Sequence, residues 1–202
     1  MKTSIIYPKN EFLKKYIKYF LFLNNNNPSY NKTHISYPNT NYCLGLYKGS
    51  KLIYRSEHEY SIVESSTYHS YITGIYNKPL AFHFSGIFDE ICIDFEPLGI
   101  EFLTGHKISS TKFINSVIEK LFHNKLKHIY AVAFEFKDPQ IRAQLLEKFF
   151  LDNIIENHKI KFIPFNEIYS CRVEDLKDTY NLSYRSIHRL YKDKLGLSPK
   201  EF

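Results

Sequence analysis

The chain has 202 residues, of which 44% are hydrophobic and 24% are charged, with 17 Tyr and 17 Phe. This composition supports one large domain, or a medium domain with a small one, and excludes an intrinsically disordered chain. The formal net charge is +6. Such a charge is compatible with a polyanionic partner such as nucleic acid, and also with a basic surface that is only solvated.

The cysteines and the apolar runs bear on where the protein works. Cys43, Cys92 and Cys171 are odd in number and far apart. This spacing argues against a disulfide framework and against a four-ligand zinc site, so we expect reduced thiols in a cytoplasmic protein. No signal peptide is evident, and the apolar run at 16–23 is too short to cross a bilayer. We therefore expect no membrane partner.

The first half of the chain has the pattern of short strands. Residues 12–23 run from a helix into a strand, and residues 24–29 form a polar loop. Gly49 and Ser50 separate two short alternating segments, which is typical of a hairpin. Strands bounded by turn residues are predicted at 42–46, 52–54, 68–76, 80–84 and 90–95. Their spacing predicts an antiparallel β-sheet, a sandwich or a half-barrel.

After residue 99 the hydrophobic period becomes that of helices. Apolar residues at three-four spacing predict one amphipathic helix over 113–122 and another over 139–150. Asp138 is expected to cap the second helix, with Pro139 at its first position. Residues 158–166 break this helix and mark a linker.

These patterns together predict an α+β protein in two parts. Residues 1–160 are expected to form an N-terminal domain, in which helices pack on the sheet or half-barrel or supply a dimer face. Residues 161–202 are expected to form a small all-α segment.

The C-terminal segment predicts two short helices joined by a tight turn. The first spans 173–180, with Leu176 facing inward. Asn181 tolerates the left-handed conformation that a tight interhelical turn needs. Ser183 is expected to cap the second helix, which spans 184–195, by accepting a backbone N–H.

The second helix has two different sides. Its apolar side consists of Ile187, Leu190 and Tyr191. Its polar side carries Arg185, His188, Arg189 and Lys192. Between Ser183 and Lys200, five basic residues are opposed by Asp193 alone. Such a helix suits insertion into the major groove of double-stranded DNA. The alternative is a helical hairpin whose basic side is only solvated.

The stretches at 182–192 (LSYRSIHRLYK) and 195–202 (LGLSPKEF) place a Tyr-Lys pair before a Gly-x-Ser-Pro segment and an aromatic residue. Over Val173 to Phe202 the chain thereby resembles the first helix-turn-helix of the AraC/XylS family of transcription regulators. The resemblance implies that Arg185, His188 and Arg189 face the base edges. It also implies that Ser183, Tyr184 and Lys192 contact the DNA backbone.

More loosely, residues 5–155 resemble the N-terminal regulatory domains attached to such regulators, through the entry segment 7–20 and the FEPLG sequence at 95–99. This implies that residues 1–160 are a sensing or dimerisation domain, on which a small-molecule effector, a homodimer partner, or both act. Family members usually continue through a linking helix into a second helix-turn-helix. Because the sequence ends at Phe202, where that helix would begin, we expect about half of the family's DNA contacts to be missing, with a loss of affinity.

Catalytic and metal sites have little support in the sequence. His58, His69 and His83 lie near Glu57, Glu59 and Asp94 along the chain, but no His-x-His pair accompanies them. Cys92 has no evident base, and neither a G-x-S-x-G elbow nor a phosphate-binding loop is present. We expect no catalytic residue, no metal and no cofactor, which disfavours a cupin-like metalloenzyme. The prediction is a DNA-binding transcription regulator; the alternative is a small-ligand-binding or protein-interaction module without autonomous DNA binding.

Overall fold

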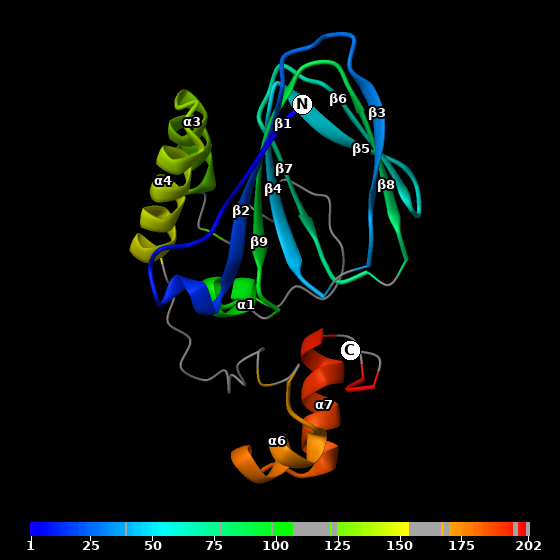
Figure 1. Cartoon of the computed structure of the whole chain (residues 1–202), viewed down its shortest axis with the longest axis vertical. Coiled ribbons are helices and arrows are strands. Elements are labelled where there is room, and N and C mark those ends of the chain that lie inside the picture. Colours follow the sequence, from blue (N-terminus) through cyan, green and yellow to red (C-terminus); the bar gives the residue numbers. More distant parts are fainter. Residues whose placement is uncertain are drawn as a thin grey trace.

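The computed structural model describes residues 1–38, 40–76, 78–97, 99–106, 122, 125–153, 167, 170–195 and 198–200. Over these residues the protein is α+β, as predicted, with nine strands in two sheets and five α-helices (Figure 1). Within the described part of the chain, no helix is both long enough and apolar enough to cross a lipid bilayer. The predicted boundary near residue 160 lies outside the described residues, as does the predicted helix at 113–122 except for Phe122.

The larger sheet is antiparallel throughout. Its strands, in spatial order, are β1 (Lys2–Ile6), β2 (Ile17–Asn25), β9 (Phe88–Phe95), β4 (Tyr42–Lys48) and β7 (His69–Thr73). A short 3-10 helix, η1 (Leu13–Lys15), precedes β2, which confirms the predicted passage from helix to strand. Successive side chains on β9 point to opposite faces, so the sheet presents one face to the helices and the other to the smaller sheet.

The smaller sheet is mixed rather than antiparallel. Its strands, in spatial order, are β3 (Asn31–Ser36), β8 (Leu80–Ser85), β6 (Glu59–Glu64) and β5 (Ser50–Ser56). β6 and β8 run parallel to each other, which departs from the antiparallel prediction. Turn residues signal that the chain reverses, but the strand partners are set by packing elsewhere in the molecule.

The hairpin predicted around Gly49 and Ser50 is wrong. The turn exists, and Gly49 takes a φ of 76°, which a residue without a Cβ adopts freely. However, β4 pairs with β7 and β9, whereas β5 pairs with β6. The turn therefore carries the chain from the larger sheet into the smaller one instead of folding it back.

Helices α3 (Leu126–Glu135) and α4 (Pro139–Asp152) cover one face of the larger sheet (Figure 1). The main core lies between the helices and the larger sheet. It is built from apolar side chains that include Phe20, Leu44, Ile91, Ile93, Phe95, Leu146, Phe149 and Phe150. As predicted, Pro139 opens α4, and Asp138 Oδ1 accepts the N–H of Gln140 at 2.8 Å. Ile141, in the first turn of α4, is 37% exposed.

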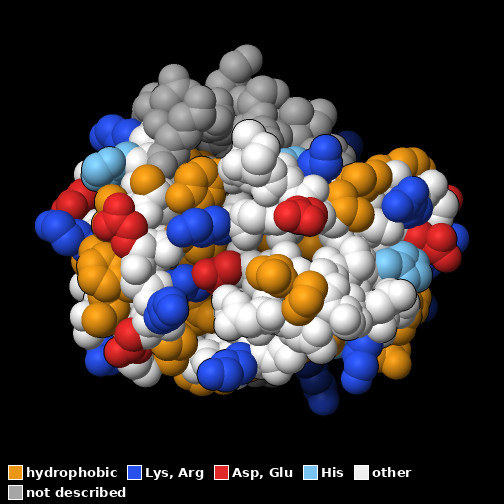
Figure 2. All heavy atoms as spheres, turned by 90° about the horizontal axis from the view of Figure 1, so that it is seen from above, with side chains coloured by type: hydrophobic (Ala, Val, Ile, Leu, Met, Phe, Trp, Pro, Cys, Tyr) orange, Lys and Arg blue, Asp and Glu red, His pale blue; other side chains and the backbone are white. Residues whose placement is uncertain are grey.

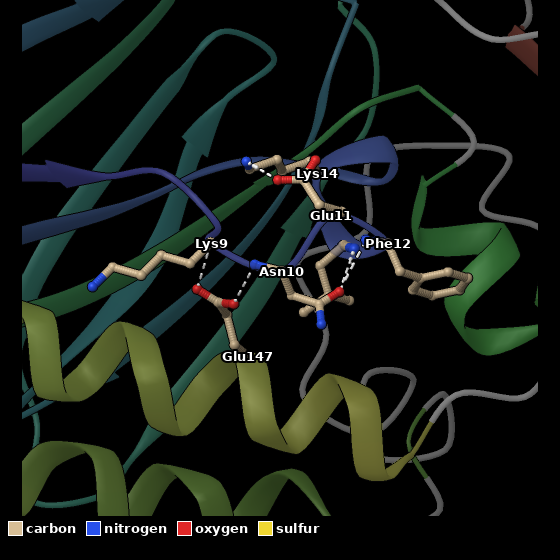
Figure 3. A network of polar contacts seen from close by, with 7 residues as sticks. Lys9, Asn10, Glu11, Phe12, Lys14 and Glu147 are labelled. Carbon is tan, nitrogen blue, oxygen red and sulfur yellow. Dashed lines mark hydrogen bonds and ion pairs between the residues drawn. The ribbon is translucent and has the colours of Figure 1, made fainter.

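Two polar connections fix α4 to the rest of the domain. The buried guanidinium of Arg142 donates to both carboxylate oxygens of Asp89 on β9, at 2.7 and 2.6 Å. Glu147 accepts the backbone N–H groups of Lys9 and Asn10, at 2.9 and 3.0 Å, as Figure 3 shows. The segment between β1 and η1 is therefore held against α4 by hydrogen bonds from its backbone N–H groups to the Glu147 side chain.

The two sheets face each other across a second core. It joins Tyr47, Tyr71 and Phe88 from the larger sheet to Leu52, Tyr60, Ile62, Leu80 and Phe84 from the smaller one. On this face Cys43 and Cys92 form a disulfide between β4 and β9, with their Cα atoms 6.4 Å apart. This corrects the expectation that both are free thiols. The cysteines are 49 residues apart in sequence, and only the strand register makes them diagonal neighbours.

Candidate nucleic-acid interface

Helices α6 (Val173–Tyr180) and α7 (Tyr184–Leu195) have the bounds that the sequence predicts. They lie at one end of the molecule, beyond α1 (Gly99–Thr104) in Figure 1. Asn181 takes the left-handed conformation, with φ 49° and ψ 50°, and the N–H of Leu182 donates to Lys177 O at 3.0 Å. The αL residue thus ends α6 and redirects the chain within three residues.

Ser183 caps α7, as predicted. Its Oγ accepts the N–H of Ser186 at 3.1 Å, and its carbonyl accepts the N–H of Ile187 at 3.0 Å. A hydroxyl acceptor at this position satisfies one of the backbone donors that the first turn leaves without an intrahelical partner. The start of α7 is therefore fixed by local chemistry.

A small apolar core holds the two helices together. Leu176 from α6 packs against Ile187 and Tyr191 from α7, and all three are buried. Ile75, which follows β7, packs both against this small core and against the main core. The helical pair is consequently in contact with the β-domain through a shared side chain.

The opposite side of α7 faces solvent. The structure places all six predicted DNA contacts in exposed positions along it or at its start: Ser183, Tyr184, Arg185, His188, Arg189 and Lys192. Two arginines and a lysine therefore present charge-assisted donors on a single helical surface. Figure 2 looks onto the opposite end of the molecule, where acidic and basic side chains are interspersed.

Tyr184 has a partner that the sequence did not reveal. Its ring is 53% exposed, and its hydroxyl donates to Glu174 Oε1, on the first turn of α6, at 2.5 Å. This hydrogen bond lowers the pKa of Glu174 and raises the pKa of Tyr184. The contact depends on the angle between the two helices, so residue spacing alone gives no signal for it. Glu174 orients the Tyr184 ring across the start of α7.

The weak metal alternative gathers no site among the described residues, where no group of three or more His, Cys, Asp or Glu could hold a metal ion. His83 Nδ1 lies 2.7 Å from Thr33 Oγ1, and His58 Nε2 lies 3.9 Å from Glu57. These histidines are thus in separate polar contacts.

Comparison of the chain with protein-family models, with curated proteins and with solved structures finds no match.

Proposed function

We propose that this chain is a cytoplasmic, DNA-binding transcription regulator of the AraC type, in which α6, the turn at 181–183 and α7 act as a helix-turn-helix. The observation that carries the proposal is the division of α7 into two sides. Ile187 and Tyr191 are buried against α6, while Arg185, His188 and Arg189 are exposed. This is the arrangement that a recognition helix needs to enter the major groove.

The roles of the contacts follow from their chemistry. Arg185, His188 and Arg189 lie in the first two turns of α7, where the side chains of a recognition helix reach base edges, and Arg can donate two parallel hydrogen bonds to guanine. Ser183 and Tyr184 stand at the N-terminal end of the helix, where backbone N–H groups and the helix dipole favour a phosphate. Such phosphate contacts fix the register of the helix on the duplex.

Regulation would come from the N-terminal domain, through an effector, a homodimer contact or both. Ile75 belongs to the main core and also touches the core of α6 and α7. A change in the end of β7 would therefore alter the support of the recognition helix. Coupling between two sites needs an element with two discrete arrangements that both sites bias.

Fluorescence anisotropy with duplexes selected from a random library tests DNA binding directly. Arg189→Ala should weaken binding to the selected duplexes more than binding to random duplexes, because a base contact carries sequence information. Lys32→Ala removes the same charge from an exposed position on β3 and should leave both affinities nearly unchanged. Equal losses on all duplexes would make Arg189 a phosphate contact instead.

Salt dependence separates the two candidate functions. A DNA-binding chain loses affinity steeply as salt rises, because each phosphate contact releases counterions. Absence of binding even at low salt would reject the proposal and favour the alternative, a ligand-binding or interaction module. The buried carboxyl groups of Glu90 and Asp94, on the face of the larger sheet that looks toward the smaller one, favour this second candidate.

A cytoplasmic location has a consequence for the cysteines. Because disulfides are rare in cytosolic proteins, a cytoplasmic location requires the Cys43–Cys92 disulfide of the folded chain to be reduced in cells, which leaves both sulfurs open to alkylation once the protein is unfolded. Alkylation during denaturing lysis, followed by mass spectrometry, measures this. A fully oxidised pair in cells would argue for an oxidising compartment and against this location.

A further inference from the structure

The face of the larger sheet that looks toward the smaller sheet carries two buried acids. Glu90 and Asp94 lie on β9, four residues apart and on the same face as Phe88, which belongs to the core between the sheets. The register places Glu90 opposite Tyr47, and Asp94 opposite Cys43, on β4. At about 3.3 Å per residue, the two carboxyl-bearing positions are about 13 Å apart along the strand.

Glu90 has an oxygen without a partner. The side chain is 2% exposed. Tyr71 donates its hydroxyl to Oε1 at 2.6 Å and Tyr47 is a second hydrogen-bond partner, but Oε2 has no hydrogen bond. Gly45 makes this arrangement possible, because a Cβ there would collide with the Tyr71 ring that crosses above it. The Tyr71 ring in turn stacks on Tyr47, at 5.6 Å between centroids. One carboxylate oxygen is therefore buried without a partner, next to the stacked pair of Tyr47 and Tyr71.

Asp94, further along the same face of β9, is also a buried acid with one oxygen that has no partner. It is 5% exposed, with Tyr19 and Asn41 as hydrogen-bond partners, and its Oδ1 has none. The Tyr76 hydroxyl is 2.5 Å from Ser36 Oγ. Burial raises the pKa of Tyr76, and the nearby Asp94 charge adds to the rise. Tyr19 and Tyr76 are only half-buried, so the Asp94 end of this face lies beside partly exposed side chains.

A buried carboxyl oxygen without a donor is costly, and a charged donor is the partner that offsets most of that cost. Burial raises the pKa of Glu90 to about 7 and that of Asp94 to about 6. A bound cation would stabilise both groups in their charged form. The neighbouring tyrosine rings add favourable cation–π contacts for an ammonium group.

We propose that the inner face of the larger sheet binds a linear organic cation with two ammonium groups, one at Glu90 and one at Asp94. A single ammonium group would leave one of the two carboxyl oxygens without a partner. The extended polyamines have the required chemistry, since their ammonium groups are separated by flexible methylene chains. This site does not depend on DNA binding, so the two proposals can fail separately.

The position of the site also gives it a route to α6 and α7. Tyr71 lies on β7, and the chain runs from the end of β7 through Ile75 to Tyr76. Tyr71 contacts Glu90, while Ile75 packs against the core of the two C-terminal helices. An occupant between the sheets would thus act on the segment that supports α7.

Thermal unfolding and calorimetric titration with spermidine test the proposal on the full chain. Spermidine should raise the melting temperature as its concentration increases, because it binds the folded state. Butylamine, with one ammonium group, should bind roughly tenfold more weakly or worse, and the neutral tetraethylene glycol should not bind. Equal responses to all three compounds, or no response to spermidine, would overturn the proposal.

Substitutions locate the site. Glu90→Gln and Asp94→Asn keep the side-chain shape, and each should weaken spermidine binding roughly tenfold or more. Glu64→Gln removes an exposed carboxylate from β6 and should leave binding unchanged. A cooperative melting curve without spermidine shows that each variant folds. Tyr71→Phe is a further variant, which keeps the ring and removes the hydroxyl that donates to Glu90. Spermidine binding that survives both isosteric substitutions would place the cation elsewhere and refute the inference.

Discussion

Replacing Glu90 by Gln should stabilise the protein at alkaline pH and change its stability little at acid pH. Burial raises the pKa of Glu90 to about 7 from its ordinary value of 4.5, although hydrogen bonds from Tyr71 and Tyr47 partly oppose the shift. The folded state therefore holds this proton more tightly than the unfolded state. The stability contributed by the neutral carboxyl is fully present below pH 4.5 and is lost as the pH rises to about 7.

The size of the effect follows from the same shift. A rise from 4.5 to about 7 corresponds to about 3 kcal/mol in the free energy of unfolding. Solvent screening takes little from this figure, because the Glu90 side chain is buried. Gln keeps an oxygen that accepts the Tyr71 hydroxyl, but it never carries the charge. Urea unfolding of both proteins, at about pH 5 and about pH 8.5, should show the difference growing from under about 1 to about 3 kcal/mol.

The chain has no Trp, so circular dichroism or tyrosine emission is the signal to follow. Asp94 is present in both proteins, so its titration cancels in the difference between their free energies of unfolding. Glu64→Gln, on β6, is the matched control, because its carboxylate is in water in the folded state. A gain in stability of equal size at both pH values, or a variant that loses stability relative to the unchanged protein as the pH rises, would refute the assignment of a buried Glu90 with a raised pKa.

Three further substitutions probe the packing and the helix cap. Arg142→Ala should lower the free energy of unfolding by about 3 kcal/mol, because it leaves the Asp89 carboxylate unpaired on β9. Gly45→Ala should lower it by about 1–3 kcal/mol, because its methyl group displaces the buried Tyr71 ring. Ser183→Ala should cost about 1 kcal/mol of α7 stability, measured by hydrogen exchange in the first turn.

Each of these predictions has a control that keeps part of the interaction. Arg142→Lys retains the charge without the two-pronged geometry and should lose less than the Ala variant. Tyr71→Phe should be milder than Gly45→Ala, because the ring stays in place. Ser186→Ala keeps the backbone N–H that Ser183 accepts, so exchange at the start of α7 should be unchanged. If a disruptive variant and its control have equal stability, the contact that the disruptive variant removes does not stabilise the protein as inferred.

Local features of the fold could be predicted from the sequence. The bounds of α6 and α7, the left-handed Asn181 and the caps at Asp138 and Ser183 are all observed as expected. Each depends on residues within one helical turn of one another, which is the range over which propensity and capping act. The exposed side of α7 follows from the same short-range periodicity.

Long-range features could not be predicted in this way. The parallel pairing of β6 with β8, and the passage between sheets at Gly49, depend on which distant strands find each other. Cys43 and Cys92 are neighbours only because of the β4–β9 register. The helix α3 is different, because its signal is short-range. Leu126, Ile129 and Ala133 have helical spacing in the sequence and are buried in the structure.

The central place of β9 also sets the order in which the domain can assemble. β9 hydrogen-bonds to both β2 and β4, although it follows them by many residues in the chain. During synthesis, β2 and β4 must therefore wait for Phe95 to leave the ribosome before either gains its inner neighbour. Domains dominated by such non-local pairings fold slowly and expose strand edges in the meantime. A nascent chain arrested before β9 is consequently the form of this protein with the greatest need of a chaperone.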